Sequence, residues 1–152
     1  MCDYCDCRSI TEIADLSIEH ERVLALTRSL RHGAGRRPAD IDADLRDLRS
    51  ALAPHTRREE TGVFAVLAAI DCDPAYRRRF LDDHARIDEM IERALVDRAA
   101  VARLVELVER HIFEEETDLY PAIRQLFSPA DWHEVEHRRE RLVLGSGSDP
   151  VT

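Results

Sequence analysis

The chain has 152 residues, 35% of them charged, with only 5 glycines and 6 prolines, which predicts one largely helical domain with a sizeable core. The formal net charge of −9 argues against nucleic acid or an anionic membrane as a partner, because both would repel it. No stretch approaches the roughly 18–20 apolar residues of a membrane span, and the amino end lacks the apolar run of a secretory signal, so we expect a cytoplasmic protein.

Apolar residues recur at intervals of three and four in four long stretches, the period of helices with one buried face. The first predicted helix covers residues 9–31 and ends at a glycine-containing turn. The second carries an apolar stripe from Ile41 to Ile70. Pro54 lies inside this second helix and predicts a kink beside His55.

The third predicted helix follows a turn, with Asp73 as its N-cap and Pro74 at its first position. Asp97 is expected to cap the fourth. The inner stripe of that fourth helix is predicted to consist of Val101, Leu104, Val108, His111, Glu115, Leu119, Ala122 and Leu126.

A short fifth helix is expected from residue 128 to about 144, and residues 145–152 are expected to form a flexible tail. Short connections place successive helices antiparallel, which predicts an all-α fold, an up-down-up-down four-helix bundle with a short fifth C-terminal helix. We expect a single domain over residues 1–144, in which the bundle proper covers about residues 9–127.

Each of the four long predicted helices places a histidine on its inner stripe, and two of them add a glutamate one turn later. The six residues are His20, His55, Glu59, His84, His111 and Glu115. A buried imidazole or carboxylate is costly unless it is hydrogen-bonded, paired or bound to a metal. At about 1.5 Å of rise per residue all six reach one height in the bundle, so the sequence predicts a site for two metal ions.

The spacing of the two His-xxx-Glu pairs places both side chains of each pair on one helix face, because positions four apart differ by only about 40° in direction. Glu60 and Glu116 lie one position later, turn away by about 140°, and are expected to contribute little. A weak internal repeat relates residues 55–60, followed by Phe64, to residues 111–116, followed by Tyr120. This repeat predicts two halves related by an approximate two-fold axis.

In such an arrangement His20 and His55 would bind one ion, while His84 and His111 would bind the other. Glu59 and Glu115 would bridge the two ions. A donor set of nitrogen and carboxylate without thiolate suits iron, with zinc or manganese as less favoured occupants. Open positions on the ions would then remain for water, dioxygen or peroxide.

The pattern has two alternative interpretations. A single histidine on an apolar helix face is more often a hydrogen-bonded core residue than a ligand, but two matching pairs and two further histidines at one height are difficult to obtain by chance. A ferritin-like site requires Glu-x-x-His on two helices, and none of the four inner histidines has a glutamate three residues before it.

The pattern resembles the hemerythrin-like (HHE cation-binding) family over about residues 10–127. The matching pieces are Glu19-His20-Glu21, His55-xxx-Glu59, His84, and His111-xxx-Glu115 through Leu119-Tyr120-Pro121. The resemblance implies a four-helix bundle that holds two non-heme iron ions joined by an oxo or hydroxo bridge.

Two departures narrow this resemblance. Oxygen-carrying hemerythrins have a fifth histidine where this chain has Asp88, and their last carboxylate lies five residues after its histidine instead of four. The chain is therefore similar to an H–HxxxE–H–HxxxE subgroup. For this subgroup the resemblance implies a small-molecule ligand, namely dioxygen, hydrogen peroxide or nitric oxide, handled either by turnover or by an iron, oxygen or redox sensor. Whether the chain is an enzyme stays open.

Three further groups of residues invite a functional interpretation. Asp88 is a candidate for an extra ligand or for an acceptor that orients a ligating imidazole, and an ordinary solvated aspartate is the alternative. Tyr120 lies nine residues beyond His111, so we expect it to pack in the core or at the rim. His133 and His137 are expected on a solvated face of the fifth helix, anchored by Trp132.

The four cysteines form a possible second site. Cys2, Cys5 and Cys7 are close in sequence, and Cys72 lies in a turn expected at the same end of the bundle. Four thiolates suit zinc or an iron–sulfur cluster. Thiol–disulfide chemistry and inert cysteines are the alternatives.

Overall fold

The computed structural model describes residues 9–32, 35–70 and 73–145, and within these ranges every regular element is a helix. The all-α prediction is therefore confirmed. The proposed thiol site of Cys2, Cys5, Cys7 and Cys72 lies outside the described residues, and so does the tail after Gly145. No helix in the described ranges is long and apolar enough to cross a membrane.

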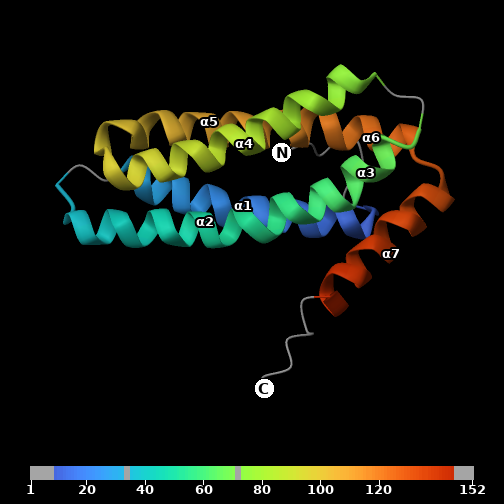
Figure 1. Ribbon diagram of the computed structural model, residues 1–152, viewed down its shortest axis with the longest axis horizontal. Coiled ribbons are helices and arrows are strands. Elements are labelled where there is room, and N and C mark those ends of the chain that lie inside the picture. The colour runs from blue at the N-terminus through green and yellow to red at the C-terminus, as the bar shows by residue number, and fades with distance from the viewer. Residues whose placement is uncertain (1–8, 33–34, 71–72, 146–152) are drawn as a thin grey trace.

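Four long helical rods lie side by side and carry shorter elements at their ends (Figure 1). In chain order the elements are α1 (Thr11–Arg31), α2 (Pro38–Thr61), α3 (Val63–Leu67), α4 (Pro74–Val96), the 3₁₀ turn η2 (Arg98–Ala100), α5 (Val101–Glu114), the π-helical turn η3 (Glu115–Leu119), α6 (Tyr120–Leu126) and α7 (Pro129–Gly145). Helix α1 packs against α2 and α5, and α4 packs against the same two helices, which closes the bundle. Helix α7 contacts α2 and α3.

The helix starts follow the predicted capping. The side chain of Asp73 accepts a hydrogen bond from the backbone N–H of Ala75 at 2.9 Å, and Asp97 does the same for Ala99 at 3.0 Å. Each carboxylate satisfies an N–H group that has no partner within the first turn. Asp73 therefore caps α4, as predicted, whereas Asp97 caps the 3₁₀ turn η2, which leads directly into α5.

The second helix is interrupted at a residue that the sequence did not single out. Helix α2 continues through Pro54 and ends at Thr61, and the break lies at Gly62, whose φ and ψ are −96° and −90°. Gly62 is buried, and its surroundings leave no room for a side chain. A Cβ at Gly62 would lie 2.8 Å from the backbone oxygen of Arg58.

The last part of the fourth rod also differs from the prediction. Ala122 and Leu126 were expected to face the core, but Leu126 is 53% exposed and the buried positions are Tyr120, Ile123 and Phe127. The π-helical turn Glu115–Leu119 explains the change, because it holds one residue more than an α-helical turn. One extra residue rotates everything that follows by about 100°, which moves the buried stripe by one position.

The core consists of two apolar clusters that lie on either side of the predicted ligands along the bundle. The first contains Val23, Leu52, Ile87 and Val108 among its members, and the second contains Leu16, Val63, Phe80 and Leu119. Each long rod therefore passes from one apolar cluster to the other, and each places its buried histidine at the boundary between them. The ligand-type residues therefore form a polar layer with an apolar cluster on each side along the bundle.

We expect Gly62→Ala to destabilise the protein by about 1–3 kcal/mol, because the new methyl group would force the backbone around Arg58 to move. Ser50→Ala on the exposed side of the same helix is the matched control, and it should change the stability by less than about 0.5 kcal/mol. Urea denaturation measures both values. A Gly62→Ala protein as stable as the control would mean that the break in α2 is not held by close packing.

Candidate metal centre

The structure brings the six predicted ligands into one cluster at the centre of the bundle. His20 comes from α1, His55 and Glu59 from α2, His84 from α4, His111 from α5 and Glu115 from the start of η3. None of these residues is more than 3% exposed. Together they are called the six-residue cluster below.

The cluster divides into two four-residue groups that can each hold a metal ion. One consists of His20, His55, Glu59 and Glu115, and the other of Glu59, His84, His111 and Glu115. Within each group, one ligand atom from every residue lies within 4.8 Å of the others. Glu59 and Glu115 belong to both groups, and a carboxylate has two oxygens, so each of these residues can serve two ions at once.

The distances within the first group suit a bound cation. Nε2 of His20 lies 3.0 Å from Nε2 of His55 and 3.1 Å from a carboxylate oxygen of Glu115. Two imidazole nitrogens that both bind one ion at about 2.1 Å, at a right angle, are also about 3.0 Å apart. Only one proton fits between two such nitrogens, whereas one cation would satisfy both lone pairs.

The second group contains buried polar atoms that have no hydrogen-bond partner among residues 9–32, 35–70 and 73–145. They are Nε2 of His84, both ring nitrogens of His111, one oxygen of Glu59 and both oxygens of Glu115. Nε2 of His111 lies 3.0 Å from Glu115, but the two groups are not aligned for a hydrogen bond. Leaving buried polar atoms unsatisfied is costly, and metal coordination would satisfy this set together.

Three histidines of the cluster contact, through Nδ1, carboxylates that the sequence analysis did not assign to the site. Nδ1 of His20 pairs with Glu116 at 3.0 Å, and Nδ1 of His84 pairs with Glu60 at 2.9 Å. Nδ1 of His55 pairs with Glu19, also at 2.9 Å. These three residues, Glu19, Glu60 and Glu116, are called the outer carboxylates.

Glu60 and Glu116 belong to neither four-residue group, in agreement with their prediction as weaker ligand candidates, but the structure gives each a contact with a cluster histidine that the sequence did not predict. Each does turn away from the ligands on its own helix, as predicted, but that direction points at the neighbouring helix. A carboxylate on Nδ1 fixes the ring orientation and leaves Nε2 free to bind a metal. The signal was present in the repeat, because both glutamates occupy the same position after a His-xxx-Glu pair.

His111 is the exception, and it breaks the approximate symmetry of the two halves. The residue that corresponds to Glu19 is Asp83, because each directly precedes a cluster histidine on its helix. Asp83 is one methylene shorter and pairs with Arg110 at 3.1 Å, while Nδ1 of His111 has no hydrogen-bond partner within the part of the chain that the structure describes. The two candidate metal positions therefore differ in how firmly their imidazoles are held.

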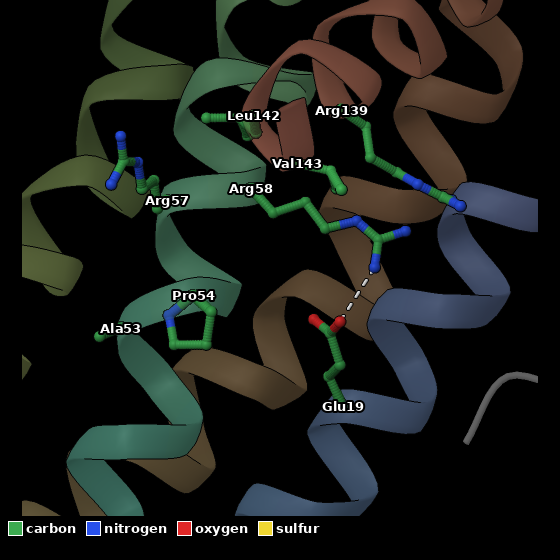
Figure 2. Close-up of a pocket in the computed structure, with 8 residues that line it drawn as sticks. All are labelled: Glu19, Ala53, Pro54, Arg57, Arg58, Arg139, Leu142 and Val143. Atoms are coloured by element: carbon green, nitrogen blue, oxygen red, sulfur yellow. Dashed lines mark hydrogen bonds and ion pairs between the residues drawn. The ribbon is translucent and has the colours of Figure 1, made fainter. Parts of the chain in front are cut away.

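A chain of charged residues connects His55 to the C-terminal helix. Figure 2 shows Glu19 of α1 paired with Arg58 of α2, at 2.9 Å, beside Arg139 of α7. Arg58 also contacts Glu12 at 2.6 Å, and Arg139 contacts the same carboxylate at 3.2 Å. Helix α7 is thus joined by ion pairs to the residues that orient His55.

Tyr120 has a role that sequence reasoning missed. It is 1% exposed, and its hydroxyl donates a hydrogen bond to Oε1 of Glu59 at 2.9 Å. The prediction of core packing is correct for its ring, but the hydroxyl also orients a shared carboxylate. Burial, followed by the negative charge of Glu59, raises the pKa of Tyr120 well above its usual value, so the hydroxyl keeps its proton. The π-helical turn supplies the rotation that places Tyr120 on this face.

The remaining candidates lie away from the cluster. Asp88 is exposed and belongs to neither four-residue group, which favours the solvated alternative. His133 and His137 are exposed on α7, as expected. Trp132 packs against Phe127 with ring centroids 5.0 Å apart, which anchors that helix.

Three residues of the cluster have shifted pKa values in the metal-free chain. Burial lowers the pKa of His20, but contacts with Glu115 and Glu116 outweigh it and raise the pKa to about 10. For His84, burial is outweighed by contacts with Glu115 and Glu59, and the pKa rises to about 11. Burial acts to raise the pKa of Glu115, but the charge of His111 and the nearby imidazoles hold it well below its usual value. In the metal-free chain these shifts favour protonated His20 and His84 beside a charged Glu115 at neutral pH.

No protein-family model, curated protein or solved structure matches the chain. The interpretation of the site therefore depends on its geometry and donor chemistry.

The pKa shifts predict how the stability of the metal-free chain depends on pH. Because the folded-state pKa values of His20 and His84 are raised above 6.5, their stabilising effect is complete below pH 6.5 and is lost as the pH rises towards 10–11. The melting temperature of the metal-free chain should fall over this range. The metal-loaded chain is the control and should not follow this trend, because its imidazoles are already neutral. Identical pH profiles for the two forms would contradict the assignment.

The outer carboxylates predict a graded loss of metal affinity. Glu60→Gln and Glu116→Gln should each weaken metal binding about 10- to 100-fold, because the imidazole behind each would lose its carboxylate partner. Glu59→Gln and Glu115→Gln should lose at least one ion, and Glu89→Gln at an exposed position of α4 is the control. Competition with a chelator of known affinity measures the differences. Outer variants indistinguishable from the control would show that these contacts do not tune the site.

Proposed function

We propose that the chain is a hemerythrin-like, non-heme di-iron protein that binds or turns over dioxygen, hydrogen peroxide or nitric oxide. The observation that carries the proposal is the pair of four-residue groups that share Glu59 and Glu115. Two histidines for each ion and two shared carboxylates are a donor set that suits iron. Four ligands per ion also leave room in an octahedral shell for a small molecule.

The proposed bundle has the up-down-up-down order expected of this family. The colour gradient in Figure 1 runs in opposite directions along α1 and α2, and again along α4 and α5, which supports alternating directions. His20 lies in the first half of α1 and His55 in the second half of α2. Opposite helix directions therefore explain how the two side chains meet at the same height.

The residues at the proposed centre have three separate roles. Iron, when bound, would supply electrons and open coordination positions for the small molecule. The four imidazoles and two carboxylates hold the ions, the outer carboxylates and Tyr120 fix the directions of these ligands, and the two apolar clusters exclude water from the polar layer. Exclusion of water favours controlled redox chemistry over leakage to solvent.

The second candidate function is an iron, oxygen or redox sensor without turnover. The ion pairs from His55 through Glu19 and Arg58 to Arg139 favour it, because they give α7 a physical connection to the metal ligands. Turnover by the purified metal-loaded protein would support the enzyme. Metal-dependent binding of another protein without turnover would support the sensor.

Metal content and thermal stability test the proposal together. Protein purified in air should carry two iron ions per chain and absorb in the near ultraviolet. A ligand that binds only the folded state stabilises it by about 4 kcal/mol at a thousandfold excess over its Kd, so chelation should lower the melting temperature by about 8–16 °C.

The response to chelation should be weaker in His84→Ala, because that variant loses one of the two imidazoles of the second group. Equal melting temperatures of chelated and loaded wild-type protein, or zinc alone at full occupancy, would refute the di-iron proposal.

A further inference from the structure

A network of ion pairs joins α7 to the residues behind the first group. Arg58 on α2 pairs with three carboxylates of α1, namely Glu12 at 2.6 Å, Asp15 at 3.1 Å and Glu19 at 2.9 Å. Arg139 on α7 pairs with Glu12 at 3.2 Å and with Asp15 at 3.0 Å. Because the side chains of Arg58 and Glu12 are only 14% and 7% exposed, solvent screens their pair less than a pair on an open surface.

The two halves of α7 are attached to the bundle in different ways. In the first half, Val135 is 0% exposed and packs in the core. Beneath the second half lies a cavity of about 430 Å³, whose lining includes Pro54 of α2 and, from α7, Arg139, Leu142 and Val143 (Figure 2). Side chains that face a cavity make few van der Waals contacts across it. The position of the second half of α7 therefore depends on the ion pairs of Arg139.

The second group has no equivalent network within the described residues. Tyr76 occupies the position that corresponds to Glu12, eight residues before the cluster histidine of its helix. Glu114 occupies the position that corresponds to Arg58, three residues after the histidine, and pairs with Arg110 on its own helix at 3.6 Å. In the part of the chain that the structure describes, the ion pairs of α7 therefore lead to the first group and not to the second.

Metal at the first group would make this connection firmer. Nδ1 of His55 contacts Glu19 at 2.9 Å, while Nε2 of His55 lies 3.0 Å from Nε2 of His20. A cation on Nε2 would hold the His55 ring from both nitrogens, and Glu19 would keep the position from which it pairs with Arg58. Without a cation the two Nε2 atoms share at most one proton, so the His55 ring and the carboxylate behind it are held less firmly. Coupling of this kind acts in both directions, so the attachment of α7 must favour the metal to the same degree.

We propose that the first group and α7 control each other: metal bound by His20 and His55 keeps the second half of α7 on the bundle, and the ion pairs of Arg139 strengthen that metal position but not the other. Arg139 is a positioning residue, which acts on the metal through Arg58 and Glu19. A change in metal occupancy thereby becomes a change in the surface that α7 forms. The inference rests on the metal-binding part of the proposed function, and it requires neither iron in particular nor turnover.

Hydrogen exchange of the full chain, measured by mass spectrometry, tests the effect of metal on α7. Chelation should speed amide exchange over residues 138–144 of the wild type by at least about 5-fold, because this segment would open more often. In Arg139→Gln the segment should exchange at the fast rate with or without metal. Arg141→Gln is the matched control, because the contacts of Arg141 with Glu134 and His137 lie within α7, and it should keep the metal dependence of the wild type.

Competition with a chelator, analysed for two ions, tests the reverse effect. Arg139→Gln should weaken one ion by a similar factor of about 5-fold or more and leave the other unchanged. The same loss should persist in a His84→Ala background, which impairs only the second group's imidazoles. Arg139→Lys, which keeps the charge, should recover part of the affinity, and Arg141→Gln should bind both ions as the wild type does. A role of Arg139 in stability alone would not weaken one ion and spare the other.

The outcomes separate this inference from the proposed function. Equal exchange of α7 in loaded and chelated wild-type protein would overturn the inference and leave the metal centre intact. An Arg139→Gln protein that binds both ions as the wild type does, or loses affinity for both equally, would overturn it as well. A chain that binds no metal would reject the inference together with the proposed function. Metal-dependent exchange that Arg139→Gln abolishes and Arg141→Gln keeps would support the inference, whether the ions are iron or zinc.

Discussion

The cost of burying charge at the centre of a helical bundle is the constraint on which the rest of this structure depends. Four imidazoles and two carboxylates share a layer with no more than 3% exposure, between two apolar clusters that offer them no hydrogen bonds. The layer is tolerable only if protons or metal ions balance the carboxylates. The raised pKa values of His20 and His84 show the first solution, and the paired four-residue groups have the geometry for the second.

The approximate two-fold symmetry of the site is informative where it fails. Glu60 and Glu116 hold His84 and His20 in the same way, but the pairing of Glu19 with His55 has no equivalent at His111. The group that contains His20 and His55 is also the one that the ion pairs of α7 reach, through Arg58 and Glu19. One half of the site is therefore held differently from the other.

Sequence reasoning succeeded where a single helical period governs the outcome. The caps at Asp73 and Asp97 and the convergence of the six ligand-type residues all follow from local rules carried over a few turns. It failed where the period changes: the π-helical turn at Glu115 moved the buried stripe to Tyr120 and Ile123, and close packing placed the break of α2 at Gly62. Periodicity within one helix carries no information about such local irregularities.

The sequence by itself determined the helical class, the histidines and glutamates that share the inner faces, and their common height, because these depend on the spacing of residues along one helix at a time. Only the tertiary structure decided what lies behind each ligand. Glu60 and Glu116 turn away from their own helix partners, and whether that direction leads to solvent or to a histidine depends on the neighbouring helix. The hydrogen bond from Tyr120 to Glu59 likewise joins two helices, and sequence periodicity within one helix does not predict such a contact.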